Sequence, residues 1–149
     1  MYSKNSNNRR TLIKKEEFIL KKVEVLVVVD AAAALASNNL QDNVYLVDTN
    51  KYWGSGNEGQ AELKTACSDG QFICWRVSAI SQDNEVSIQG FTGQMINEKV
   101  CTPQSQGISG DIYWEGRVES QGSTGEKQYS MNLVIDGKVM TFDPFIEIK

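Results

Sequence analysis

Apolar and polar residues alternate over several short stretches of this chain, a pattern that predicts β-strands. The alternation is clearest in residues 129–135 and returns in residues 73–79, 86–88 and 112–118. Residues 44–47, VYLV, read as a further short strand. Strands at a spacing of roughly 8–12 residues, separated by turn-forming pairs, are typical of an antiparallel sandwich or barrel. The pattern therefore predicts an all-β fold, an antiparallel β-sandwich.

The first apolar segment, residues 17–29, contains VLVVV without alternation, which predicts a strand covered on both faces. Asp30 follows and precedes AAAALA, the stretch with the highest helix propensity in the chain. We expect Asp30 to be the N-cap of a one- or two-turn helix that ends at Ser37-Asn38-Asn39. The sandwich thus has a short helical insertion after its first strand.

Near the C-terminus, Asp136-Gly137 predicts a tight hairpin turn, with residues 139–142 as the returning strand. Pro144 interrupts the ladder, so residues 145–148 are predicted as a short edge strand or a bent continuation.

The chain has 149 residues, and we expect residues 18–149 to form a single β-sandwich domain. Residues 1–17 are polar and are predicted to be a disordered extension. No stretch approaches the roughly 18 apolar residues of a membrane span, and Glu24 and Asp30 break the only segment that imitates a signal peptide. We therefore expect a cytoplasmic protein, with release by lysis or non-classical export left open.

The net charge of −4 argues against nucleic acid as a partner. The chain contains no histidine, which removes the commonest general base, the commonest metal ligand and the usual activator of a nucleophilic serine or cysteine. We expect no catalytic residues, no metal and no cofactor, and hence a protein that is not an enzyme.

An enzyme can work without histidine by using carboxylates, lysine or a bound metal, and a glycosidase could do so with two carboxylates. The sequence does not show which acids meet in space, and Asp30 and Asp136 are explained by the helix cap and the turn. The available acids are Asp30, Asp48, Glu58, Asp111, Glu115, Asp136 and Asp143.

The segment GSGNEG fits the G-x-G-x-x-G pattern of a dinucleotide-binding loop, with glycines at positions 54, 56 and 59. A helix over residues 60–66 would be too short for a crossover, and the following strands look antiparallel. We interpret the segment as a flexible surface loop.

The three cysteines lack C-x-x-C spacing, so neither a zinc site nor a disulfide framework is predicted. Cys74 reads as a core residue, whereas Cys67 and Cys101 are either reduced or paired in an oxidising compartment.

Two aromatic pairs, Tyr52-Trp53 and Tyr113-Trp114, suggest a glycan site, because aromatic faces stack on sugar rings and nearby polar groups bind hydroxyls. Trp75 and Trp114 are predicted to fill the core, and both roles stay open for Trp53. The candidate ligand-binding residues are Asn50, Tyr52, Trp53, Asp111, Tyr113 and Arg117.

Four segments, VEVLVVVDAAAALA, NVYLVDTN, ICWRV and MTFDPFIEI, resemble the inclusion-body protein family of the PixA/AidA type over Val23 to Lys149. The resemblance implies a bacterial cytoplasmic protein that accumulates in crystalline inclusions in host-associated bacteria. It implies self-association, as a homodimer or a larger assembly formed by edge strands or exposed apolar surface, and it assigns no catalytic residues. The alternative function is a lectin that binds host or bacterial glycans.

Overall fold

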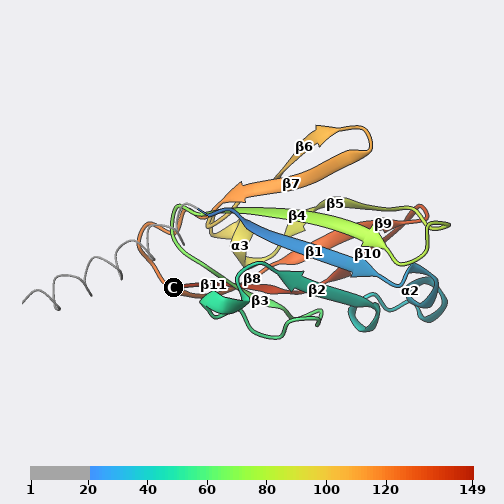
Figure 1. Cartoon of the computed structure of the whole chain (residues 1–149), viewed down its shortest axis with the longest axis horizontal. Helices are drawn as coiled ribbons and strands as arrows, with labels where there is room; N and C mark the ends of the chain where they lie inside the picture. Colours follow the sequence, from blue (N-terminus) through green and yellow to red (C-terminus); the bar gives the residue numbers. More distant parts are fainter. Residues whose placement is uncertain (1–20) are drawn as a thin grey trace, which may run out of the picture.

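The structure is a computed structural model that describes residues 21–149, and strands dominate it (Figure 1). The predicted disordered extension, residues 1–17, lies outside the described residues. The strands are β1 (Val23–Val29), β2 (Val44–Asp48), β3 (Lys64–Cys67), β4 (Phe72–Ala79), β5 (Val86–Thr92), β6 (Gln104–Ile108), β7 (Asp111–Arg117), β8 (Gly125–Gln128), β9 (Ser130–Ile135), β10 (Lys138–Phe142) and β11 (Phe145–Ile148). The helices are α2 (Ala31–Ser37) and α3 (Gln94–Asn97), with 3-10 turns η1 (Gln41–Asn43) and η2 (Lys51–Trp53).

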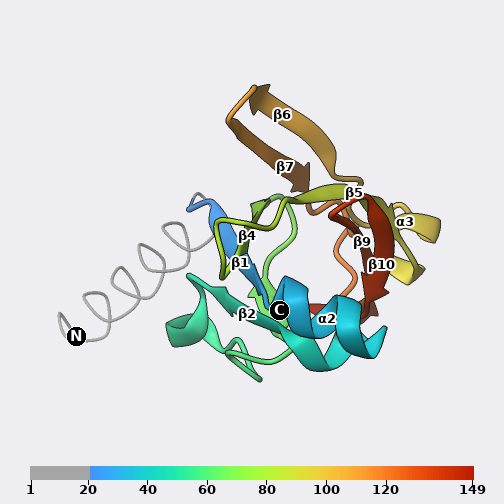
Figure 2. The ribbon, with the colours of Figure 1, turned by 90° about the vertical axis from the view of Figure 1, so that its right-hand side faces the viewer.

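The strands form three sheets that enclose one core. The largest has the order β2-β1-β4-β7-β6, and the two smaller ones have the orders β10-β9-β5 and β3-β11-β8. Seen end-on, β1, β2 and β4 lie across from β9 and β10, and α2 lies at one end of the molecule (Figure 2). The predicted all-β sandwich with a short helix after the first strand is confirmed. Two strand pairs, β1–β4 and β3–β11, are parallel, which alternation along the chain does not predict.

The core is filled by the inward-facing residues of these sheets, among them Trp75 and Tyr129, both fully buried. In β1 the side chains alternate between buried and exposed positions, and Leu26 is 40% exposed. The prediction that the first strand is covered on both faces was therefore wrong. Among residues 21–149, no second layer covers the outer face of β1, so the apolar side chains there lie at the surface.

The predicted helix and its caps are confirmed. The Ala33 N–H donates to Asp30 Oδ1 at 3.2 Å, and the chain leaves α2 through Asn38, whose φ of 53° is left-handed. Ala31 and Ala34 are buried, so the helix closes one end of the sandwich.

The hairpin turn at Asp136-Gly137 is also confirmed, with φ values of 46° and 85° that suit a tight turn between β9 and β10. β11, in contrast, lies between β3 and β8, so its prediction as an edge strand was wrong. Pro144 precedes the strand, and its missing N–H therefore costs β11 no ladder bond. Residues 60–66 are not helical, because the chain turns there and enters β3.

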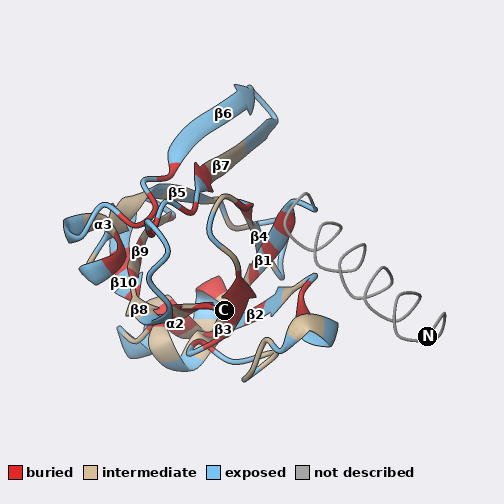
Figure 3. Ribbon diagram, turned by 90° about the vertical axis from the view of Figure 1, so that its left-hand side faces the viewer, coloured by how far each residue is buried: buried red, intermediate tan, exposed pale blue. Residues whose placement is uncertain are grey.

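The β6–β7 hairpin stands away from the rest of the molecule (Figures 1 and 2). β7 pairs with β4 only from Phe72 to Trp75 and then diverges from it. Every residue of β6 is exposed, as the pale blue ribbon in Figure 3 shows. The hairpin thus forms a wall that overhangs the side of the sandwich.

Candidate binding groove

A groove runs between this hairpin and β5, which is an edge strand of the β10-β9-β5 sheet. It has a volume of about 480 Å³ and continues into a second hollow of about 680 Å³ that shares part of its lining. We call the first of these the hairpin groove. Its lining residues are Val77, Val86, Ser87, Ile88, Ser105, Gly110, Ile112 and Trp114.

The hairpin groove lies where β4 and β7 stop pairing with each other. Beyond Trp75, β4 has no partner on the side where β7 diverges, within the part of the chain that the structure describes. Aromatic packing holds Trp114, the aromatic residue of the lining: Phe91 lies between Trp75 and Trp114, with ring centroids 4.9 and 5.6 Å away. The hairpin side of the groove therefore carries an aromatic ring, and aliphatic residues of β4 and β5 form the opposite side.

The lining of the hairpin groove is mostly apolar. Five of its lining side chains are apolar, and Ser87 and Ser105 supply hydroxyl groups. None of the eight lining residues carries an ionisable side chain. The groove can bury an apolar group, but its own lining offers no acid, base or charged nucleophile.

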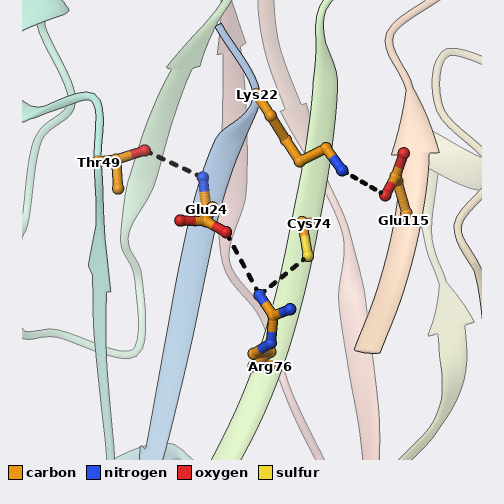
Figure 4. A network of polar contacts seen from close by, with 6 residues as sticks. All are labelled: Lys22, Glu24, Thr49, Cys74, Arg76 and Glu115. Carbon is orange, nitrogen blue, oxygen red and sulfur yellow. Dashed lines mark hydrogen bonds and ion pairs between the residues drawn. The ribbon is translucent and has the colours of Figure 1, made fainter. Parts of the chain in front are cut away.

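The outer face of the five-stranded sheet carries a charged network (Figure 4). Lys22 Nζ lies 2.9 Å from Glu115 Oε2, and Arg76 Nη1 lies 3.4 Å from Glu24 Oε1. Arg76 also lies over the Tyr113 ring at 4.8 Å from its centroid. The hydrogen bond to Glu115 raises the pKa of Lys22. The network links neighbouring strands on a solvated face, where such ion pairs contribute little stability.

A pair of carboxyl groups meets at the free edge of β2. Glu58 Oε2 accepts a hydrogen bond from the Asp48 N–H at 3.1 Å. Burial raises the pKa of Glu58 to about 7, and the neighbouring Asp48 carboxyl adds to this effect. Of the acids considered from sequence, Asp48 and Glu58 are therefore brought together, at a strand edge rather than in the hairpin groove.

The first half of the predicted glycan site lies on η2 and just before it. Asn50 is buried, and its Nδ2 donates to the Ala66 carbonyl at 2.6 Å, so it holds the chain in place. Tyr52 is 82% exposed, and its ring meets that of Trp53 edge-on at 5.4 Å. These aromatic side chains are accessible to a ligand.

The second half lies on β7. Asp111 is exposed at the hairpin turn, Tyr113 lies under Arg76, and Arg117 Nε donates to the Gly70 carbonyl at 3.2 Å. β1 and β4 separate β7 from β2, a distance of roughly 14 Å at the usual strand spacing. The six predicted residues are thus divided between two places, and the structure does not bring them together in one pocket.

Sequence reasoning missed the residues that line the hairpin groove. Trp114 was predicted to fill the core, and it is only partly buried and packs against the core from the groove side, while Ile112 is exposed. β6, with the sequence QSQGI, has no apolar alternation and gave no strand signal.

The three thiols are free and buried. Burial raises the pKa of Cys101 to about 12 and also raises that of Cys67, so neither is ionised near neutral pH. Within residues 21–149, no three His, Cys, Asp or Glu side chains are grouped so as to hold a metal ion. No helix in that range is long and apolar enough to span a membrane.

Comparison with known proteins relates this chain both to a family model and to solved structures. A family model described as "Domain of unknown function (DUF8788)" matches residues 21–141. The crystal structure of an inclusion body protein (PixA) from Burkholderia cenocepacia J2315 superposes with a TM-score of 0.62 and 12% sequence identity. That match covers 87% of this chain and 92% of the other, and it confirms the predicted resemblance at the level of the fold. No curated protein matches the sequence.

Proposed function

This chain belongs to the family described as a domain of unknown function (DUF8788), and on that premise we propose that it is a non-enzymatic protein that self-associates, like an inclusion-body protein. We place it in the bacterial cytoplasm, in intracellular inclusions. The structural likeness to an inclusion body protein supports this proposal, as does a groove without ionisable lining residues. The observation that carries the proposal is the unprotected edge of β6.

β6 is an edge strand whose five residues are all exposed and uncharged. Natural proteins usually protect such edges with charged residues, prolines or a covering segment, because unpaired backbone groups recruit other strands. The opposite edge of the same sheet, β2, has such a cover: the Gly59 N–H donates to the Leu46 carbonyl at 2.6 Å. Within the described residues, β6 is therefore the open edge of the five-stranded sheet.

β6 of one chain can pair antiparallel with β6 of a second copy of the chain, and such a pairing is self-complementary. A two-fold axis at Gln106 places Gln104 opposite Ile108 of the second copy and sets no like charges against each other. Ile108 is 77% exposed in the single chain, and a second copy would cover part of it. The product is a continuous ten-stranded sheet that spans both copies.

Sedimentation velocity over a range of protein concentrations tests this contact. We expect the natural chain to reach a mass of twice its 16.6 kDa, and Gln106→Lys to remain at 16.6 kDa because two lysines would oppose each other across the axis. The matched control is Val139→Lys on β10, an exposed position at the edge of another sheet. A natural chain that stays monomeric, or a Gln106→Lys variant that still dimerises, would refute the contact.

Glycan binding is a second candidate function, and the exposure of Tyr52 favours it. An uncovered ring beside Trp53 can stack on a sugar face. A glycan array should show signals that Tyr52→Ala abolishes and that Tyr45→Ala, which alters an exposed aromatic residue on β2, leaves intact. If no glycan binds, or if both variants bind equally, the lectin function is dismissed.

A further inference from the structure

Residues 57–59, part of the glycine-rich segment, cover the edge of β2 that faces away from β1. Gly59 donates its N–H to the Leu46 carbonyl, and Glu58 accepts from the Asp48 N–H. These bonds occupy backbone groups that a further strand would otherwise use. Left-handed φ values of 61° at Asn57 and 87° at Gly59 shape the segment. We call residues 57–59 the edge cover.

The edge cover depends on two acids that touch. Asp48 Oδ1 accepts the Asn50 N–H at 2.9 Å, and Glu58 Oε2 accepts the Asp48 N–H. The other two carboxyl oxygens, Asp48 Oδ2 and Glu58 Oε1, are buried and have no hydrogen-bond donor within the described part of the chain. Two ionised carboxylates in this position would repel each other and leave both oxygens unsatisfied. One proton held between the two groups removes the repulsion and supplies a donor.

The surroundings supply little positive charge to replace that proton. Lys51 on η2 favours the ionised form of Glu58, but its effect is the smallest of the causes that shift Glu58. On β3 and next to β9, Cys67 and Tyr129 are uncharged near neutral pH, and the Asp48 charge further disfavours their ionisation. The pKa of Glu58 of about 7 places the loss of the shared proton near neutral pH.

We propose that the edge cover is a proton-operated gate: a proton shared by Asp48 and Glu58 holds it on β2, and loss of that proton to solvent releases it and exposes the strand edge. The gate acts at the opposite end of the sheet from β6, so it stands independently of the proposed pairing there. It also gives the glycine-rich segment a role that its resemblance to a nucleotide loop does not.

Amide hydrogen exchange measured residue by residue from pH 5.5 to 8.5 tests the gate. After correction for intrinsic exchange, protection of the Asp48 and Gly59 amides should fall by up to about tenfold per pH unit above pH 7, as expected for opening linked to one proton. Protection of the Val27 amide, within β1 in the interior of the sheet, should stay constant. A constant protection of Asp48 and Gly59 in the natural chain would overturn the proposal.

Two variants distinguish opening that depends on the shared proton from opening of the fold by any other cause. Glu58→Gln keeps an oxygen acceptor for the Asp48 N–H but cannot ionise, so protection should become independent of pH, and Asp48→Asn should do the same. Glu62→Gln, at an exposed acid nearby, should retain the natural pH dependence. If Glu58→Gln lost protection with pH as the natural chain does, the shared proton would have no role.

Discussion

The indole N–H of Trp75 donates a hydrogen bond to the hydroxyl of Tyr129 at 3.1 Å in the centre of the core. Trp75 belongs to β4 of the five-stranded sheet, and Tyr129 immediately precedes β9 of a smaller sheet. Both side chains are fully buried. The bond therefore joins two layers of the sandwich and satisfies two polar groups that water cannot reach.

Replacing Tyr129 with Phe should lower the free energy of unfolding by about 1–3 kcal/mol, because the Trp75 N–H is left buried without an acceptor. Urea unfolding followed by tryptophan fluorescence measures the change. The control is Tyr45→Phe, which removes a hydroxyl from an exposed residue on β2 and should change stability by less than about 0.5 kcal/mol. Equal effects of the two variants would mean that the interior bond adds nothing.

Much of this fold could be predicted from period-two alternation, and the reason is physical. Strands such as β4 and β9 have one face against the core, so their apolar residues recur at every second position. β6 has no buried face and gave no signal. The order of the strands was also beyond prediction, because β1 pairs with β2 and with the distant β4, and alternation does not encode partners.

The same limit explains the divided glycan site. Tyr52 and Tyr113 are equally suggestive as sequence, but two intervening strands separate the segments that carry them. Asp48 and Glu58 show the converse case. They are ten positions apart in the chain, and only the fold of the glycine-rich segment onto the β2 edge brings the Glu58 carboxyl group to the Asp48 N–H.

The raised pKa of Glu58 also predicts how the stability of the fold depends on pH. Its pKa is about 7 in the folded chain, compared with an ordinary value of 4.5, so the folded state keeps a proton that the unfolded state releases. This stabilisation is fully present below pH 4.5 and is lost as the pH rises through 7. The urea midpoint of the natural chain should therefore fall relative to that of Glu58→Gln between pH 4.5 and 8. A constant difference between the two midpoints would contradict the shift.

The lowered pKa of Asp69 predicts that stability depends on pH in the opposite direction. Its carboxylate accepts the backbone N–H groups of Ser120 and Gly122 at 2.8 and 3.0 Å, and these bonds lower its pKa. The stabilisation is present above its ordinary pKa of 3.8 and is lost as the pH falls through the lowered value. Asp69→Asn should reduce the thermal midpoint at pH 7, and the deficit should shrink toward pH 2. Asp83→Asn, in an exposed turn, should show no such change.

Gly116 on β7 has a steric role, because the hairpin crosses close to the segment that precedes β6. A β-carbon at this position would lie 2.7 Å from Cys101 Sγ and 3.1 Å from the Pro103 nitrogen. Gly116→Ala should lower the free energy of unfolding by about 1–3 kcal/mol, as overpacking typically does. Gly90→Ala on β5 meets no atom within 4 Å and is the matched control. Chemical denaturation that finds both variants as stable as the natural chain would show that the base of the hairpin can move to accept the extra carbon, and the hairpin would then be a less rigid wall of the groove than its packing indicates.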